Sequence, residues 1–576
     1  MTATADRKQR KRKIPLTLAV GAMFAACLVL IPIAYASTYV VNIPLDSPIY
    51  DELDTLDGLG YLDTYFREVR PISRVEAARL TVEAEANLNQ AETREPLAAA
   101  LTANLRSQLH EEVSWIENDT EDVQPSVFHP IDRVETQYLF SSGAVRQWLT
   151  SGPRQPLNAT EGTPLLPNND GLPTAPGSNE IFRLSGWGGF GGFLTGYAEG
   201  AVSGPFTREV HGASPGQLLG AEAVVSLGNV AFSFGQEERG WGTGYFNQLS
   251  NSDNAPLIPA FTVQNIHPKT WPWLLRYLGP GRRTVFFGQL DAIRPLSQHP
   301  WIFSHVMAFK PLPTFEIGIT RTILFGGRDN DHYDDLGFAG RASGVATGLV
   351  SAGNTKSRAG IFLKFNFPSL RNLQLYQEIL GSDNLTFEVP TIGHYMPFLN
   401  VAYQGGLYLP RLTKDGLTDL RFEYALIPPG YAINFQSALY YTYNGALLGD
   451  PMGPNSSEAD LQFGRWFNLR YKGALDFFYT SRSPGIYEGN ERSFFQANSP
   501  FYPYGPLTTE RSGGIAFDLL RLPQMAAFAH GARLEGKARL AFEYVNQMNY
   551  GGPSSFRTLA LLSFGFAPDA AGLTWR

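Results

Sequence analysis

The spacing of apolar residues divides the chain into a short N-terminal part and a long C-terminal part. Between residues 46 and 115, apolar side chains recur every three to four positions, which predicts helices. From about residue 130 onward they alternate with polar or small residues, which predicts strands. The clearest alternating sets are Leu420, Phe422 and Tyr424; Phe315, Ile317 and Ile319; and Phe556, Thr558, Ala560, Leu562, Phe564 and Phe566.

Three short helices are expected in the N-terminal part. Ser47 can cap the first helix, which has Pro48 in its first turn and an end at Gly58 and Gly60. Ser73 and Glu76 have the spacing of a capping box for a second helix. A third helix begins near Pro96, where one face is predicted to carry Leu97, Leu101, Leu105, Leu109 and Val113.

Short breaks alternate with long polar segments in the strand region. The breaks fall near residues 310–314, 368–372, 410–418 and 523–531, and the long segments cover about 326–357, 381–396, 444–460 and 481–510. A loop is also expected over 152–179. A transmembrane barrel has this asymmetry, with tight periplasmic turns and long outer loops. Strands in a bilayer must pair every backbone group, so the sheet closes on itself. Roughly 24 residues per strand between residues 130 and 566 allow on the order of 16 to 20 strands.

The composition supports strands rather than helical membrane spans. Aromatic residues make up 13% of the chain, charged residues make up 17%, and there are 58 glycines. This mixture favours long strands and turns. Beyond the N-terminus no stretch of 18 apolar residues occurs, so helical membrane spans are not expected in the body of the chain.

The N-terminus has the three parts of an export signal. Six basic residues between Arg7 and Lys13 precede an apolar run from Ile14 to Ile33, and Ala34-Tyr35-Ala36 provides a cleavage site before Ser37. We therefore expect residues 1–36 to be a cleaved signal peptide; the alternative is a retained anchor helix. The one cysteine, Cys27, lies inside this segment. The apolar run continues past it, which argues against a lipoprotein site.

Cleavage would also change the chemistry of the chain. The mature chain would keep 40 Lys and Arg against 52 Asp and Glu, a net charge of about −12. Such an acidic protein repels phosphate backbones, which argues against a nucleic-acid partner. Without Cys27 it would have no disulfide, thiolate metal site or cysteine nucleophile. We expect a helical domain over 37–120, on the periplasmic side, and a barrel over 121–576.

No motif in the sequence points strongly to catalysis or metal binding. The segment around Ser214 matches a nucleophile elbow, but Pro215 lacks the N–H that an oxyanion hole needs there. The nine histidines include no His-x-x-x-His pair on a predicted helix, and no pair of carboxylates stands out for glycoside hydrolysis. We therefore expect no catalytic residue, no metal site and no cofactor. A solvated acidic loop explains Asp329, Asp331, Asp334 and Asp335 better than a calcium site does.

The most distinctive segment runs from Glu238 to Asn247. Its aromatic rings can stack on sugar rings, and its Arg and Asn side chains can bond sugar hydroxyls. The alternative is an aromatic girdle residue followed by a tight loop. The candidate carbohydrate-binding residues are Arg239, Trp241, Tyr245, Asn247 and Asn254, with Tyr487, Tyr502 and Tyr504 in the loop at 481–510.

Arg321 conflicts with its place in the alternating pattern. Its phase puts it with Ile317 and Ile319 on the presumed lipid face. A charge at the bilayer midplane would cost about 2–4 kcal/mol. Two alternatives are open: a bulge turns Arg321 inward, or it lies near a rim.

Several motifs occur in the order in which one known family carries them. On these residues the chain, from about Val41 to its end, resembles the capsule assembly protein Wzi family of outer-membrane proteins. The motifs are Pro44-Leu45-Asp46-Ser47 through Leu53–Gly60, Pro71–Ala78, Gly240-Trp241-Gly242, Phe287–Asp291, Phe309–Pro313, Ile319–Thr322 followed by Gly326-Gly327, Arg421–Tyr424 and Gly449–Pro454.

The resemblance implies an 18-stranded barrel and lectin-like attachment of capsular polysaccharide at the surface of a Gram-negative cell. It also implies a helical bundle at the periplasmic side that occludes a polar lumen. The chain departs from the family pattern in two ways. The family often has a second tryptophan and a proline around the Trp-Gly piece, where this chain reads Gly240-Trp241-Gly242-Thr243-Gly244, and it often has a histidine where this chain has Asp450. The identity of the bound sugar is therefore not implied.

Taken together, we expect a non-enzymatic, monomeric outer-membrane barrel that binds capsular or exopolysaccharide, contacts outer-membrane lipid and does not bind nucleic acid. Two rivals remain. A porin-like channel for solutes or exported polymer would conduct ions, and a barrel enzyme acting on lipid or glycan would need converging catalytic side chains.

Overall fold

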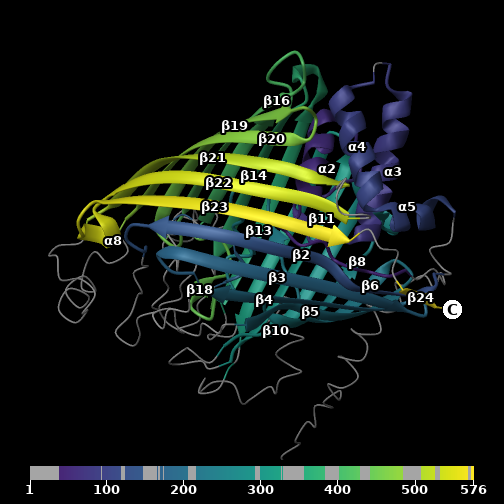
Figure 1. Ribbon diagram of the computed structural model, residues 1–576, viewed down its shortest axis with the longest axis horizontal. Helices are drawn as coiled ribbons and strands as arrows, with labels where there is room; N and C mark the ends of the chain where they lie inside the picture. The colour runs from purple at the N-terminus through teal and green to yellow at the C-terminus, as the bar shows by residue number, and fades with distance from the viewer. Residues whose placement is uncertain are drawn as a thin grey trace, which may run out of the picture.

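A computed structural model gives the architecture of the chain (Figure 1). It describes residues 38–92, 94–118, 124–146, 165, 169–172, 174–204, 216–291, 299–325, 327, 356–382, 401–428, 441–483, 508–525, 532–568 and 573–575. Within this part of the chain, 18 antiparallel strands form a closed barrel. The strand number implied by the family resemblance is therefore confirmed.

Each barrel strand pairs with its neighbours along the chain, and β2 pairs with β23 to close the ring. The strands are β2 (Ser126–Ser142), β3 (Gly177–Phe190), β4 (Leu194–Gly204), β5 (Gly216–Leu227), β6 (Val230–Gln236), β8 (Pro259–Asn265), β10 (Pro280–Gln289), β11 (Trp301–Leu312), β12 (Phe315–Phe325), β13 (Lys356–Phe367), β14 (Leu373–Ser382), β15 (Val401–Leu409), β16 (Thr418–Ile427), β19 (Ser456–Phe467), β20 (Tyr471–Arg482), β21 (Glu510–Met525), β22 (Ala532–Asn546) and β23 (Ser555–Pro568). Five short pieces accompany them: β1 (Val69–Arg70), β7 (Gly240–Trp241), β9 (Lys269–Thr270), the hairpin of β17 (Thr442–Tyr443) and β18 (Ala446–Leu447), and β24 (Leu573–Trp575).

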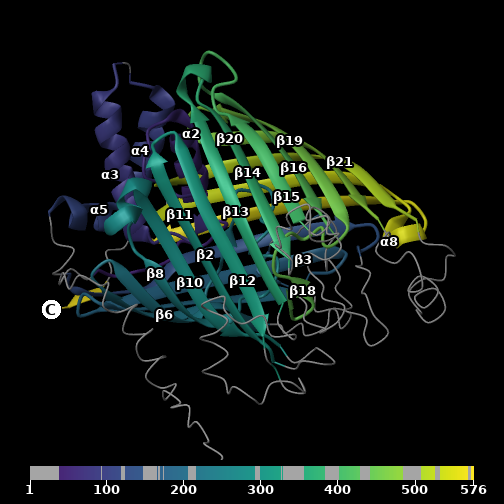
Figure 2. The same cartoon turned by 180° about the vertical axis from the view of Figure 1, so that it is seen from behind.

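The two ends of the barrel differ in their connections. At one end, which we call the turn end, strands join through short segments such as residues 313–314 and 468–470. The connections at the other end, the loop end, are longer. All four predicted breaks fall at the turn end, although β21 extends through Pro523 as far as Met525. Helices α2 to α5 gather at the turn end, while α8 (Met548–Gly551) lies at the loop end (Figures 1 and 2).

Alternation in the strands separates an apolar outer wall from a polar lumen. In β12, Phe315, Ile317 and Ile319 face outward, and Glu316 and Thr320 are buried inside. The outward Phe315 stacks on Phe365 of β13, with ring centroids 4.8 Å apart. An apolar outer face and a closed sheet suit a hydrocarbon surrounding.

The side chain of Arg321 keeps the outward direction that the alternation predicts. The alternative in which a bulge turns it inward is therefore wrong. It pairs in regular register with His305 of β11 and Ala359 of β13. The register shift between β11 and β12 lies elsewhere, between Phe309 and Leu312. Arg321 is half-buried, in the middle of its strand rather than at a rim.

The helical domain forms largely as its capping residues predict. Ser47 caps α2 (Pro48–Leu59), and Ser73 caps α3 (Arg74–Gln90) by accepting the Glu76 N–H at 3.3 Å. Gly58 lies inside α2 rather than ending it; the end is at Gly60, with φ of 84°. The segment predicted as a third helix forms two helices, α4 (Pro96–Gln108) and α5 (His110–Glu117), which meet at Leu109.

The four helices share one apolar core with the base of the barrel. Leu53, Leu56, Leu101 and Leu105 are fully buried in it, together with Trp466 from β19. No described helix is both long and apolar enough to span a membrane. The expected signal peptide, the acidic loop at 329–335 and the Ser214 motif all lie outside the described residues. Strand β3 begins at Gly177, so the loop expected over 152–179 ends slightly earlier than predicted.

Candidate functional site in the barrel lumen

The distinctive segment that carries Trp241 folds into the lumen. It connects β6 to β8, and its short strand β7 pairs with β1, which follows α2 in the N-terminal domain. The Trp241 side chain is 0% exposed, and its ring centroid lies 5.4 Å from that of Phe286 on β10. We call this unit, residues 38–72 together with 237–258, the plug. Trp241 is therefore part of the apolar core between the plug and the wall.

Tyr245 lies between two arginines from different parts of the chain. Its ring centroid is 3.5 Å from the guanidinium carbon of Arg421 on β16 and 5.2 Å from that of Arg67 in the plug. The backbone N–H groups of Tyr245 and Phe246 donate to Glu423 at 2.5 Å and 3.2 Å. The wall therefore fixes both the backbone and the ring at this position.

The other three candidates in this segment also bond to the protein itself. Arg239 donates to the Glu237 carboxylate at 3.0 Å and to the Thr262 hydroxyl at 3.3 Å. Asn247 donates to Glu458 on β19 at 3.0 Å, and Asn254 donates to the Leu447 carbonyl at 3.1 Å. A cavity lined by Glu237, the partner of Arg239, and by Asn42 and Glu238 among others has a volume of only about 30 Å³. A cavity of this size holds about one water, far less than a sugar-binding pocket needs.

The structure therefore brings five of the eight predicted carbohydrate-binding residues into one segment, in which Arg239, Trp241 and Asn247 are buried and Tyr245 and Asn254 are half-buried. Tyr487, Tyr502 and Tyr504 lie outside the described residues, in the connection between β20 and β21. Contact with a sugar stays a prediction for all eight. For Trp241, such contact requires the plug segment to move, because no face of the ring is open.

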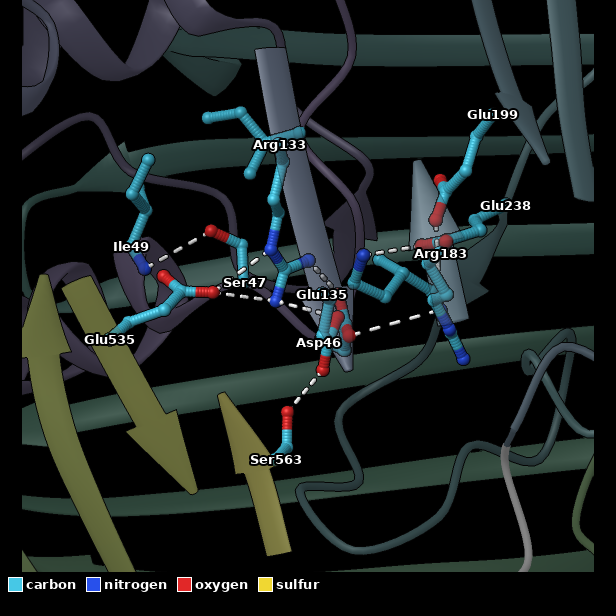
Figure 3. A network of polar contacts seen from close by, with 12 residues as sticks. Asp46, Ser47, Ile49, Arg133, Glu135, Arg183, Glu199, Glu238, Glu535 and Ser563 are labelled. Carbon is cyan, nitrogen blue, oxygen red and sulfur yellow. Dashed lines mark hydrogen bonds and ion pairs between the residues drawn. The ribbon is translucent and has the colours of Figure 1, made fainter. Parts of the chain in front are cut away.

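Asp46 of the plug is the centre of an ion-pair network with the wall (Figure 3). Arg133 on β2 reaches Asp46 at 3.1 Å, Glu135 at 3.0 Å and Glu535 of β22 at 2.7 Å. Burial alone would raise the pKa of the Asp46 carboxyl, but Arg133, Lys537 and Arg183 together hold that pKa below its usual range. Asp46 is therefore ionised at neutral pH.

Arg183 extends the same network toward the loop between β2 and β3. It contacts Asp170 at 3.1 Å, Glu199 at 3.8 Å and Asp46 at 3.9 Å. Nearby, the Leu45 N–H donates to the Glu238 carboxylate. Charged side chains from four wall strands, β2, β3, β4 and β22, thus form one network around Asp46, just before the start of α2.

Two further contacts join α2 to the opposite side of the wall. Asp57 accepts from Lys364 of β13 at 2.8 Å and from Gln374 of β14 at 2.9 Å. Asp54 accepts from Arg67 at 2.9 Å, and Arg67 also donates to the Thr243 carbonyl at 2.8 Å. Burial raises the pKa of Asp54, but Arg67 and neighbouring arginines outweigh it and lower that pKa to about 2.

Sequence reasoning missed this network, although one signal was present. Arg133, Glu135 and Gln137 alternate on β2, and charged residues that alternate inside a barrel strand face the lumen. The pattern could not name the partners, because Arg133 and Glu535 are 402 positions apart. Among the described residues, no group of three or more His, Cys, Asp and Glu side chains has an arrangement that could hold a metal ion.

Comparisons with known structures identify the fold. The solved structure of Wzi from Escherichia coli, described as an outer-membrane protein involved in group 1 capsule assembly and as a carbohydrate-binding β-barrel, shares 16% identity. It covers 91% of this chain and 99% of its own, with a TM-score of 0.61. OccD3 from Pseudomonas aeruginosa shares 10% identity over 77% of this chain and 92% of its own, with a TM-score of 0.42.

Sequence comparison gives the family. No curated protein sequence matches the chain. Residues 150–507, more than half of the chain, match the family described as capsule assembly protein Wzi. The resemblance seen in the short motifs is thereby confirmed, and this chain belongs to the capsule assembly protein Wzi family.

Proposed function

We propose that this protein is a non-enzymatic outer-membrane barrel that binds capsular or other surface polysaccharide and helps to attach it to the cell. The family match carries the proposal. The fold supports it, since the relative that it matches over 99% of that chain's length is described as a carbohydrate-binding barrel. In this reading residues 1–36 are a cleaved signal peptide, the turn end and the helical domain face the periplasm, and the loop end faces outward.

The arrangement of the lumen favours attachment over transport. The plug crosses the described lumen: its apolar core around Trp241 packs on the wall, Asp46 pairs with Arg133 of β2, and Asp57 pairs with Lys364 of β13 on the opposite side. An open channel needs a continuous aqueous path. The rigid wall would instead present the outer loops, where many weak sugar contacts along a repeating polymer add up.

The candidate residues then have two proposed roles. Tyr487, Tyr502 and Tyr504 belong to a connection at the loop end, where their rings can stack on sugars directly. Trp241 holds the plug under the loops, so it acts on the polymer either after a movement of its segment or by keeping the loops in place.

Retention of polysaccharide by whole cells tests the proposal. A strain without this protein should shed labelled surface polysaccharide into the medium, and the wild-type gene should restore retention. Normal retention in the deletion strain would refute an attachment role. Among variants with wild-type barrel levels, loss of retention by Tyr502→Ala but not Trp241→Ala would assign direct contact to the loop; the reverse would assign it to the plug segment.

A further inference from the structure

One turn at the turn end carries large apolar side chains that nothing in the described chain covers. The 3-10 helix η1 (Trp273–Leu278) lies between β9 and β10, and Figure 2 shows it as a short teal turn near the bases of the strands. Trp273 is 88% exposed, Leu274 is 81% exposed and Tyr277 is 68% exposed. Exposed apolar side chains that are consecutive, rather than scattered, mark an interaction surface.

Strand pairing and close packing hold η1 in place. β9 pairs with the start of β10 through Thr270 and Pro280. Gly279, with φ of 73°, packs so closely on the next hairpin that an added Cβ would lie 2.0 Å from the Lys310 carbonyl oxygen. At the other side, His267 and Asn229 exchange two hydrogen bonds of 2.7 Å and 2.9 Å. The exposed rings are therefore held out from the barrel by its own framework.

The position of η1 relative to the wall shows which surroundings its side chains meet. Phe309 has the outward phase of β11, yet it is only 7% exposed, because Trp271 packs edge-on against it with centroids 6.3 Å apart. Trp271 lies two residues before the start of η1. The segment therefore lies against the outside of the barrel and continues its apolar outer face.

The charges of this segment are all of one sign. From Pro268 to Arg283 inclusive, the sequence contains four Lys or Arg residues and no Asp or Glu. Arg282 points inward and donates to the Pro71 carbonyl at 2.8 Å. Two others accompany the exposed rings: Lys269 lies over Trp271 at 5.7 Å from its centroid, and Arg276 lies over Tyr277 at 4.8 Å. Cations beside Trp and Tyr suit the level of the phosphate groups at a membrane surface.

Another turn of the same end provides a contrast. The 3-10 helix η2 (Pro368–Leu370) joins β13 to β14 and exposes one large apolar side chain, Leu370, at 55%. It is followed by Arg371 and Asn372 and has no aromatic residue. The turn at η2 shows that strands at this end can be joined without exposed aromatic residues. The exposed aromatic residues of η1 are therefore not required by the turn itself.

We propose that η1 is a lipid anchor: Trp273, Leu274 and Tyr277 insert into the leaflet at the turn end, and Lys269 and Arg276 bind phospholipid phosphates. The anchor fixes the depth of the barrel at the side of β8 to β11, the strands that carry Arg239's partner Thr262 and the Trp241 contact Phe286. This inference does not depend on polysaccharide binding.

Site-directed spin labelling of the full chain in phospholipid nanodiscs tests the anchor. In a Cys27→Ser background, a nitroxide at Leu274→Cys should be several-fold more accessible to oxygen than to a water-soluble nickel chelate. A nitroxide at Leu370→Cys is the matched control and should favour the nickel chelate. Equal, water-exposed profiles at the two positions would overturn the proposal.

The lipid composition separates the apolar from the phosphate contribution. Replacing Lys269 and Arg276 with glutamine should move the Leu274→Cys label toward water, and more so in phosphatidylglycerol than in phosphatidylcholine discs. A label that stays buried in both lipids would remove the phosphate contacts from the proposal. Low accessibility of the Leu274→Cys label to both oxygen and the nickel chelate would indicate a protein contact in place of lipid and would overturn the proposal.

Discussion

The helical domain and the ion-pair network of Asp46 and Arg133, which we call the seam, are held together by different forces. The helices share an apolar core in which Leu53, Leu56 and Leu101 are fully buried. The seam, in contrast, consists of ion pairs from Asp46 and Arg133 to strands of the wall. The free energy gained by burying an apolar side chain depends little on which apolar side chain it packs against. A buried charge that lacks its partner, in contrast, is strongly unfavourable. Packing therefore stabilises the helical domain, and charge specifies how the first part of the plug docks on the wall of the lumen.

The largest effect is expected from breaking the seam. Arg133→Ala leaves Asp46, Glu135 and Glu535 without their shared cation, which should destabilise the docked plug by about 4 kcal/mol. Trypsin should then cut the plug faster, and single-channel recordings should show openings that are rare in the wild type. Arg133→Lys keeps the charge, so its proteolysis rate and its frequency of channel openings should lie between those of the wild type and Arg133→Ala. A silent Arg133→Ala protein with wild-type proteolysis would show that the seam does not hold the plug.

A cavity in the helical core should cost somewhat less and should leave the barrel intact. Leu101→Ala removes a fully buried side chain from α4 and should destabilise the helical domain by about 3 kcal/mol. Circular dichroism at the helical minimum should show earlier melting, while heat-modifiable migration of the barrel on gels stays unchanged. Equal loss of barrel stability would mean that the domain and barrel unfold as one unit.

The pH dependence of the helical domain should depend on Glu52. Burial raises its pKa to about 8, although Asn104 and Gln108 donate to it at 2.9 Å and 2.6 Å. The folded domain keeps this proton up to about pH 8, whereas the unfolded chain loses it near 4.5. The free energy of unfolding should therefore fall by about 2 kcal/mol between pH 5 and pH 7.

A variant and a neighbouring carboxyl sharpen this prediction. Glu52→Gln should remove the fall in helical melting temperature between pH 5 and pH 7. Asp54 changes the stability of the domain with pH in the opposite direction, because its pKa is lowered to about 2. Its contribution to the free energy of unfolding is present at neutral pH and is lost as the pH drops through that value. A wild-type domain with the same melting temperature at pH 5 and pH 7 would contradict the assignment of Glu52.

The smallest effect is expected for an ion pair outside the seam. Arg465 and Asp415 lie 3.0 Å apart at the turn end, with both side chains 43% exposed. Exposed pairs contribute about 0–1 kcal/mol, so Arg465→Ala should leave plug proteolysis and conductance unchanged. If it released the plug as effectively as Arg133→Ala, burial would not be what distinguishes the two pairs.

Local signals in the sequence predicted most of the fold. Ser47 and Ser73 cap their helices because a cap depends on residues within one turn, and the outward Phe315 and Ile317 follow from alternation alone. The break at Leu109 was not predicted, because the four-residue apolar repeat continues through it.

The candidate site was harder to predict, because it depends on long-range packing. Aromatic and glycine residues around Trp241 suit both a sugar-binding loop and a segment that packs inside a barrel. Its burial depends on the pairing of Val69 with Trp241, between strands that the sequence places far apart. The partners of Asp46, Arg133 of β2 and Lys537 of β22, likewise come from both ends of the barrel sequence.

The central claim, that this barrel holds polysaccharide rather than conducting it, is tested most directly by binding. Purified full-length protein, immobilised in detergent, would be exposed to polysaccharide collected from the medium of the deletion strain. We predict saturable binding that is reversed by excess unlabelled polymer and absent with polymer from a strain of different capsule. No binding, together with steady single-channel conductance of the same preparation, would contradict the account and identify a channel.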